Sequence, residues 1–256
     1  MKILAIGDLV GDIGYQKLRK ILPELKKENQ IDFTIVNGEN VAGGMGITQK
    51  HLDGILTAGA DVITMGNHTW GKKDIFNFID CPQLIRPANY SKGVPGKGYG
   101  VYECKQKKIL VINLIGRTDM NVLSENPFTV VDTILQTFHS KVDYTIVDFH
   151  AEATAEKIAM GYYLDGRAQI VFGTHTHVQT ADESILPKGT AYITDIGMTG
   201  PKYSVIGMDI ATSMKRFVTS LPERYKLAEG EAVLNGCLFE INDETNTMVQ
   251  IQRINR

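Results

Sequence analysis

Residues that could bind a metal ion recur along the chain, each time directly after a short apolar segment. Seven of them lie at five such positions: Asp8, Glu39, Asn40, Asn67, His150, His175 and His177. Together with His68, which follows Asn67, they include four of the six histidines of the chain. Carboxylates, imidazoles and amide oxygens without a thiolate suit zinc, manganese, iron(II) and related ions. These positions therefore predict metal-dependent chemistry.

The apolar segments before these residues have the features of buried strands. They are short, rich in β-branched residues and apolar on both faces. The predicted strands are Ile3–Ile6, Phe33–Val36, Val62–Met65, Ile109–Ile115, Tyr144–Phe149, Ile170–Phe172 and Ala191–Thr194. The predicted helices are Tyr15–Lys27, Thr48–Ala58 with Thr48 as N-cap, Lys72–Ile79, Pro127–Phe138, Ala153–Leu164 and Asp209–Leu221. We expect Pro23 to kink or split the first helix.

Strands that alternate with helices predict βαβ units and a largely parallel sheet. Ligands bind at the carboxyl edge of such a sheet, so candidate residues spread over 170 positions can converge there. In the last third, Ala232–Ile241 and Thr247–Ile254 flank a polar turn, which is typical of an antiparallel hairpin and predicts a mixed second sheet. No linker-like or repetitive segment divides the chain, so we expect one domain over residues 1–256.

The number of candidate ligands favours two ions. Seven exceed what one tetrahedral or octahedral ion would take from protein while keeping open positions for a substrate. A carboxylate can bridge two ions, because its two oxygens suit the separation of roughly 3.5–4 Å found in two-metal hydrolytic sites. Glu39, midway along the set, is the natural bridging residue.

Other residues of chemical interest have simpler interpretations. We expect His51 and His139, in a helix and at a helix end, to be structural, and Trp70 to lie in the core. Gly43–Gly46 lacks the Gly-Lys-Ser/Thr ending of a P-loop, and we interpret it as a flexible loop near the site. Arg117 has two interpretations that the sequence leaves open, a phosphate-binding residue and a solvated surface residue.

The order of the candidate residues resembles the calcineurin-like metallophosphoesterase superfamily, although each motif is altered. The Asp-x-His, Gly-Asp, Gly-Asn-His-Asp/Glu and Gly-His-x-His motifs of that superfamily become Asp8-Leu9-Val10, Gly38-Glu39-Asn40, Gly66-Asn67-His68-Thr69 and Gly173-Thr174-His175-Thr176-His177. The first metal site has therefore lost a histidine ligand, and the resemblance implies that Asn40 replaces it. The altered motifs, together with the segments Gly7–Asp12 and Asp195–Pro201, are similar to those of the bacterial YmdB-like phosphodiesterase family. This resemblance extends over nearly the whole chain.

This resemblance implies a fold, a ligand assignment and an activity. The implied fold is a four-layer α/β/β/α sandwich with two mixed sheets. One ion would be held by Asp8, Glu39, Asn40 and His177, and the other by Glu39, Asn67, His150 and His175. His68 would be the general acid of the reaction rather than a ligand. The implied reaction is hydrolysis of 2′,3′-cyclic nucleotides, with iron as the expected metal and manganese or zinc as alternatives.

Composition excludes several other classes of partner. The net charge of −2 and the pI near 6.3 provide no broad cationic field for DNA, long RNA or an anionic membrane. Three cysteines in no CxxC pair favour a reducing compartment and a packing role: Cys81, Cys104 and Cys237. The first apolar run is too short for a signal peptide, so we expect a cytoplasmic protein. The charge favours a small substrate over a polymer, and the family resemblance implies that this substrate is a phosphodiester. The sequence leaves open whether the chain forms a homo-oligomer.

Two alternatives belong to other function classes. A metal-dependent amidohydrolase also uses a His-x-His pair, but in that barrel the pair follows the first strand, where this chain has Asp8. A signalling protein could keep a metal for stability alone, although His68 would then have no role. Turnover of a generic phosphodiester with and without a chelator distinguishes this second alternative from an enzyme.

Overall fold

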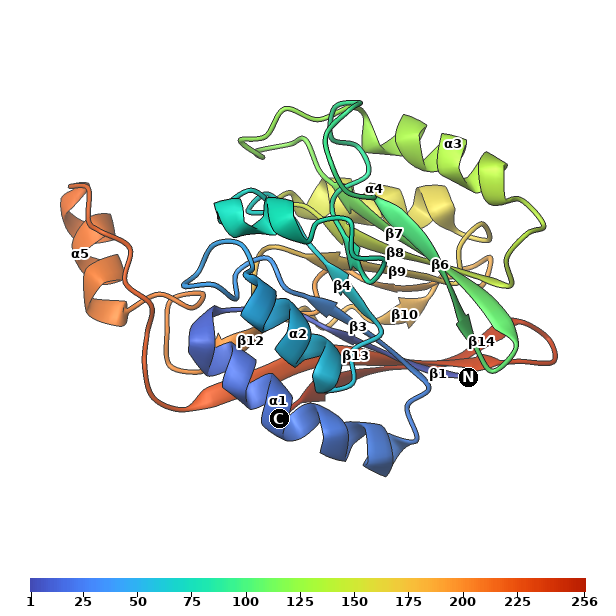
Figure 1. Cartoon of the computed structure of the whole chain (residues 1–256), viewed down its shortest axis with the longest axis horizontal. Coiled ribbons are helices and arrows are strands. Elements are labelled where there is room, and N and C mark those ends of the chain that lie inside the picture. The colour runs from blue at the N-terminus through green and yellow to red at the C-terminus, as the bar shows by residue number, and fades with distance from the viewer.

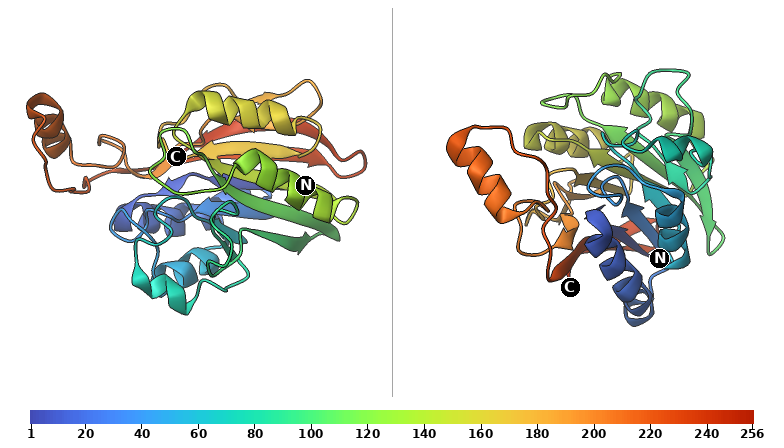
Figure 2. Two further views of the ribbon diagram at one scale, coloured as in Figure 1. Left: turned by 90° about the horizontal axis from the view of Figure 1, so that it is seen from above. Right: turned by 60° about the vertical axis from the view of Figure 1, so that its left-hand side comes forward.

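Two β-sheets pack face to face in the computed structural model, which describes residues 1–256, and helices cover both outer faces (Figures 1 and 2). The first sheet has the strand order β2-β12-β13-β1-β3-β4-β5, with β14 paired to β13. Its strands are β1 (Lys2–Ile6), β2 (Asp8–Leu9), β3 (Phe33–Asn37), β4 (Val62–Thr64), β5 (Leu84–Ile85), β12 (Met198–Pro201), β13 (Ala232–Asn242) and β14 (Thr247–Asn255). Strands β1, β3, β4 and β5 are parallel, whereas β13 is antiparallel to β1, β12 and β14.

The second sheet has the order β10-β11-β9-β8-β7-β6. Its strands are β6 (Tyr99–Cys104), β7 (Lys107–Ile115), β8 (Tyr144–His150), β9 (Ile170–Thr174), β10 (Ser184–Ile185) and β11 (Ala191–Ile193). The four inner strands are parallel, and the two edge strands, β6 and β10, are antiparallel to their neighbours. Both sheets are therefore mixed, as predicted.

Three apolar cores separate the four layers. The first lies between α1 (Gly11–Asn29), α2 (Gln49–Thr57) and the outer face of the first sheet, where Leu18 and Leu22 meet Leu4 and Ile6. The core between the sheets contains residues of both, including Phe33 and Phe172. The third lies under α3 (Pro127–Phe138) and α4 (Thr154–Leu164). This layering confirms the predicted α/β/β/α sandwich. The amidohydrolase alternative requires a barrel, and the two sheets form none.

Several predictions about individual elements need correction. Pro23 does not split α1, because it lies on the solvent-exposed side of the helix, where water can satisfy the backbone carbonyl left without a donor; the alternative of a kink stays a prediction. The helix expected over 72–79 is a short 3₁₀ turn, Lys73–Asn77. The β13–β14 hairpin forms as predicted, but it extends the first sheet beside β1 rather than building the second one. Both faces of β13 are buried over most of its length, which suits an inner strand.

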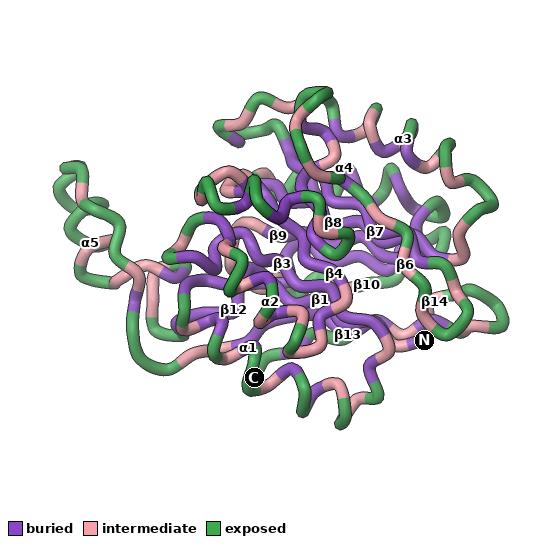
Figure 3. The backbone as a smooth tube through the Cα atoms, viewed as in Figure 1, coloured by how far each residue is buried: buried purple, intermediate pink, exposed green.

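One segment leaves the body of the molecule. Residues 202–230, here called the arm, project from the end of β12 and carry α5 (Ile210–Thr219), at the left of Figure 1. No residue of α5 is buried, and the arm is the most exposed part of the chain in Figure 3. Asp209 caps α5 by accepting a hydrogen bond from the backbone N–H of Thr212. No helix of the chain combines the length and apolar character that a membrane span needs.

Candidate metal centre

The carboxyl ends of strands from both sheets meet at one place and bring the predicted ligands together. Glu39, His150 and His175 follow or end β3, β8 and β9, and their ligand atoms all lie within 4.8 Å of one another. The Nε2 atom of His150 is 3.1 Å from Glu39 Oε1, 3.0 Å from His175 Nδ1 and 2.9 Å from Asn67 Oδ1. The expected edge is therefore shared by two sheets, rather than belonging to one.

The other three predicted ligands surround this cluster. The carboxylate of Asp8 accepts a hydrogen bond from the backbone N–H of His175 at 3.2 Å, and its Oδ1 lies 3.8 Å from His150 Nδ1. Asn40 donates from Nδ2 to the carbonyl of Gly44, which leaves its side-chain oxygen available. His177 lines the same cavity as Glu39 and Asn40. The structure thus places all seven predicted residues around one site.

Two oxygen atoms show that these residues fit a bound cation. Asp8 Oδ1 and Asn40 Oδ1 are buried and have no hydrogen-bond partner. A buried polar oxygen without a partner destabilises the fold, because it has lost its hydrogen bonds to water. A bound cation would replace those hydrogen bonds. Zinc and similar ions bind N and O ligands at roughly 2.0–2.2 Å, which puts neighbouring ligand atoms about 3.0–3.5 Å apart. The contacts of His150 Nε2 at 2.9–3.1 Å are close to this spacing.

Gly66 has no side chain, and Glu39 and His150 occupy the space where one would lie. It stands two residues after β4, and a Cβ atom there would lie 2.3 Å from both Glu39 Oε2 and His150 Nε2. No real Cβ atom makes contacts of that length with groups held on two strands. The glycine is therefore required by the approach of the candidate ligands, not by a special backbone conformation.

Hydrogen bonds behind the cluster orient two of the imidazoles. Thr174 donates its hydroxyl hydrogen to Asp148 at 2.7 Å, so its oxygen can accept a hydrogen bond from His150 Nδ1 at 2.9 Å. This arrangement turns the Nε2 atom of His150 toward Glu39. His175 has the opposite orientation, with Nε2 3.0 Å from the Glu152 carboxylate and Nδ1 facing the cluster. A carboxylate or hydroxyl behind a histidine is a common support of metal-binding imidazoles.

Charges in the cluster are tightly coupled. Burial disfavours the charged form of Glu39, but His150 and His68 outweigh it and lower the pKa of Glu39 to about 2. Burial likewise opposes the charge of His150, yet Glu39, Asp8 and Asp148 raise its pKa to about 9. Burial, followed by the charge of His150, lowers the pKa of His175 to about 3. The carboxylates thus stabilise one positive charge at the centre of the cluster, which is the charge that a cation would supply.

The turn that carries the last two histidines has an unusual backbone. His175 and His177 have φ angles of 101° and 64°, a region that non-glycine residues rarely occupy. Asp195, fully buried, holds this turn because it accepts hydrogen bonds from both the backbone N–H and the hydroxyl of Thr176, at 3.1 and 2.7 Å. Lys157, also buried, forms an ion pair with Asp195 at 2.7 Å.

Sequence reasoning missed Glu152, Asp195 and Lys157. Glu152 lies just after β8, two residues beyond His150, and this closeness was the available signal. Asp195 begins the segment Asp195–Pro201, which carried the family resemblance without an assigned role. Lys157 gives no signal in the sequence, because a lysine within a helix is ordinarily exposed.

The residues given simpler interpretations lie away from the cluster. His51 bonds Thr48 and packs edge-on against Tyr15, and His139 caps the end of α3. Trp70 is only partly buried and stacks on Phe76. Arg117 is exposed and does not line the cavity beside the candidate ligands. Of the cysteines, Cys237 is buried, whereas Cys81 and Cys104 are partly buried at the edges of the cores.

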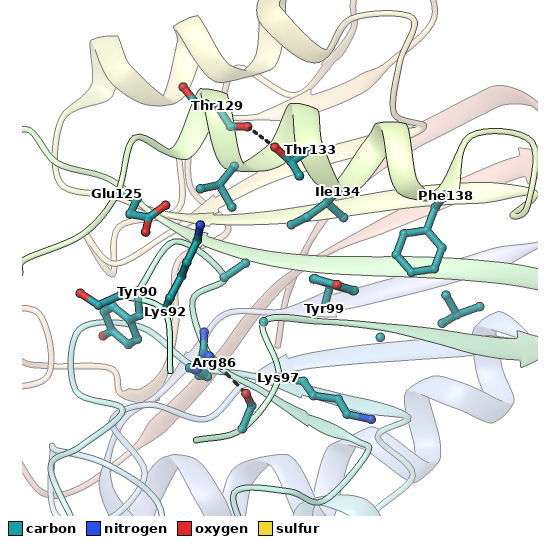
Figure 4. A pocket seen from close by; sticks show the side chains of 17 residues that line it. Arg86, Tyr90, Lys92, Lys97, Tyr99, Glu125, Thr129, Thr133, Ile134 and Phe138 are labelled. Atoms are coloured by element: carbon teal, nitrogen blue, oxygen red, sulfur yellow. Dashed lines mark hydrogen bonds between the residues drawn. The ribbon is translucent and has the colours of Figure 1, made fainter. Parts of the chain in front are cut away.

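A cavity of about 370 Å³ opens beside the candidate ligands. Its lining includes Gly43, Gly44 and Met45, so the glycine loop does lie at the site. No lysine or arginine lines it. A larger hollow of about 870 Å³ lies between β6 and α3 (Figure 4). Arg86 in that hollow donates to four backbone carbonyl oxygens and is thereby committed to holding the 86–97 segment.

Known proteins resemble this chain over nearly its whole length. The sequence model of a family described as "YmdB-like protein" matches residues 4–254. The chain belongs to the YmdB-like family. It is 52% identical over 255 residues to the 2′,3′-cyclic-nucleotide 2′-phosphodiesterase of Bacillus subtilis, a match that covers 99% of this chain and 96% of the relative. Family membership and this relative make the chain a hydrolytic enzyme of the metallophosphoesterase type.

Solved structures give the same result for the fold. A crystal structure of a phosphatase from Mycoplasma pneumoniae superposes with a TM-score of 0.95 at 38% identity and covers 100% of this chain and 93% of its own. A 5′-nucleotidase precursor from Thermus thermophilus, at 11% identity, shares the fold with a TM-score of 0.57, over 100% of this chain and 54% of that protein. The YmdB-like chain therefore has the fold that the sequence resemblance implied.

Proposed function

We propose that this YmdB-like protein is a dinuclear phosphodiesterase that hydrolyses 2′,3′-cyclic nucleotides. One ion is held by Asp8, Glu39, Asn40 and His177, and the other by Glu39, Asn67, His150 and His175. The observation that carries the proposal is the convergence of seven ligand candidates in which two buried oxygens have no partner. The name of the Bacillus subtilis relative supports the substrate.

Residues of the chain then have distinct tasks in hydrolysis. Two bound ions supply neutralisation of the phosphate oxygens and acidification of a water molecule. Glu39 would serve both ions; its Oε1 lies 3.1 Å from His150 Nε2, and the backbone N–H of His68 orients its carboxylate by donating to Oε2 at 3.0 Å. His68 lines the cavity, and its side chain forms no hydrogen bond with the candidate ligands, so its imidazole is available to protonate the departing ribose oxygen.

The lining of the cavity favours a diester over a monoester. A monoester carries one more negative charge, and no lysine or arginine of the cavity is available to bind it. A monoanionic cyclic diester needs no cation beyond the ions themselves. Long RNA is disfavoured too, because phosphate contacts along a strand require a cationic surface that a chain of net charge −2 lacks.

Steady-state kinetics on a four-substrate panel tests the proposal. The panel contains 2′,3′-cyclic AMP, 3′,5′-cyclic AMP, a nucleoside monophosphate and a short RNA, with elemental analysis of the purified protein alongside. We expect the highest kcat/KM for 2′,3′-cyclic AMP, two ions per chain, and loss of turnover after chelation. A higher kcat/KM for the monoester or the RNA would refute the substrate, and a fully active protein with one ion or none would refute the dinuclear site.

A further inference from the structure

The cavity beside the metal centre has two chemically different walls. One wall consists of the candidate ligands, and the other is apolar and comes largely from the arm. Four arm residues form it: Ile206, Met208, Tyr225 and Leu227. Val10 and Met45 extend this apolar wall on the body of the molecule. The cavity therefore suits a molecule with an anionic group at one end and a flat apolar group at the other.

The backbone of the arm places these four side chains together. Met208 forms isolated β-bridges with Val205 and with Leu227, and Ala228 N–H donates to the carbonyl of Gly207 at 3.0 Å. The outgoing and returning segments are thus paired as an antiparallel ribbon. Because alternate residues of an extended chain share a face, Tyr225 and Leu227 point to the same side of the ribbon. This is the side on which the cavity lies.

The root of the arm is fixed to the metal centre. The Nδ1 atom of His177 lies 2.9 Å from the carbonyl oxygen of Ile206, a hydrogen bond from a candidate ligand to the arm. Leu227 packs beside Gly44, where a Cβ atom would lie 3.3 Å from Leu227 Cδ2. The apolar wall is therefore held at a set place relative to the phosphate end of the cavity.

Tyr225 is the aromatic residue of this wall, and it is 73% exposed. The guanidinium of Arg216 lies over one face of this ring, 5.7 Å from its centre, and leaves the other face uncovered by it. An exposed ring of this kind offers a free face on which a flat group can stack. Nucleobases stack on aromatic side chains with gains of roughly 5- to 150-fold in affinity per base.

We infer that the apolar wall of the arm is the nucleobase subsite of the enzyme, with Tyr225 stacking on the base of a nucleotide whose phosphate lies at the metal centre. This inference rests on the proposed function and adds to it the residues that select a nucleotide among cyclic diesters. The ring needs no base-specific hydrogen bond, so purine and pyrimidine nucleotides are both accepted.

Two cyclic substrates test the inference, 2′,3′-cyclic AMP and glycerol 1,2-cyclic phosphate, which has the same five-membered diester without a base. We expect Tyr225→Ala to raise KM for the nucleotide at least fivefold with kcat unchanged, and to leave both constants for the glycerol diester unaltered. Tyr225→Trp should retain a low KM for the nucleotide. The matched control is Tyr203→Ala, which removes an exposed tyrosine of the same arm that does not line the cavity.

The possible outcomes separate this inference from the proposed function. Equal effects of Tyr225→Ala on both substrates, or no effect on either, refute the base subsite while the hydrolysis of cyclic diesters stands. A wild-type enzyme that turns over neither cyclic diester refutes the proposed function and the subsite with it. An equal rise in KM with Tyr203→Ala shows a general disturbance of the arm and also overturns the assignment to Tyr225.

Discussion

Asp195→Asn is the change that tests most directly how the fold holds its candidate ligands. The carboxylate of Asp195 receives Lys157 at 2.7 Å, two donors of Thr176 and the backbone N–H of Gly197 at 2.8 Å. An asparagine has one acceptor oxygen for these four donors and no charge for the buried ammonium. Removing one partner of a buried ion pair typically costs about 3–5 kcal/mol, and we expect that loss in the free energy of unfolding of the metal-free protein.

The same substitution should weaken metal binding, because Thr176 lies between His175 and His177. The single oxygen of asparagine cannot serve Lys157, Thr176 and Gly197 together, so the Thr176 hydrogen bonds weaken. The strained turn can then relax, since each such backbone conformation costs of order 1–3 kcal/mol. Loss of an outer support of a metal ligand typically lowers affinity about 10–100-fold. We expect a fall of this size in competition titrations against a chelator.

Lys157→Met separates the two effects. It leaves a buried carboxylate unpaired and should destabilise the metal-free protein by a similar amount, but the Thr176 hydrogen bonds remain, so metal affinity should fall less than in Asp195→Asn. The double variant should regain part of the lost stability and still bind metal weakly. Wild-type metal affinity in Asp195→Asn, or restored affinity in the double variant, would refute a positioning role for Asp195.

Three further predictions concern the site itself. Glu39→Ala should lose both ions or keep one weakly, whereas His177→Ala should mainly deplete one position, as measured by elemental analysis; equal depletion by both would contradict a bridging Glu39. Gly66→Ala should abolish metal binding, because its Cβ would lie 2.3 Å from Glu39 and His150. Gly93→Ala, whose Cβ meets no atom within 4 Å but whose φ of 87° strains an alanine, should lose some stability and keep the wild-type metal content. His68→Ala should retain its metals and lose about 10²–10⁴-fold in kcat on nucleotides, but less on nitrophenyl diesters, whose leaving group needs no proton. An equal loss on both substrates would exclude His68 as the general acid.

The candidate site could be predicted because its residues stand at strand ends. A polar group directly after a buried apolar strand is a local signal, and it pointed to Asp8, Glu39, Asn67, His150 and His175 without knowledge of the sheet order. The division into two sheets carries no such signal. Strands β4 and β8 look alike as buried parallel strands, and only the pairing of distant segments decides which sheet each one joins.

Supporting residues were harder to predict for a related reason. Lys157 is buried because α4 lies against the second sheet at the position where Asp195 emerges, a coincidence between segments 38 residues apart. The arm is a different case. Its helix was predicted over 209–221, and a surface helix ordinarily packs one face on the body, yet none of the residues of α5 is buried.

The place of β13 in the first sheet sets the order in which the site can be built. Asp8 follows β1, and β1 is flanked on one side by β13, which pairs Ala5 with Cys237. During synthesis the ribosome has therefore released Asp8 long before the strand that completes its surroundings has been made. The candidate ligands, residues 8 to 177, are all made before residues 232–242 of β13, so the candidate metal centre is complete only in the nearly finished chain. Shortening the chain from its C-terminal end removes that neighbour, and should abolish metal binding although no ligand is deleted.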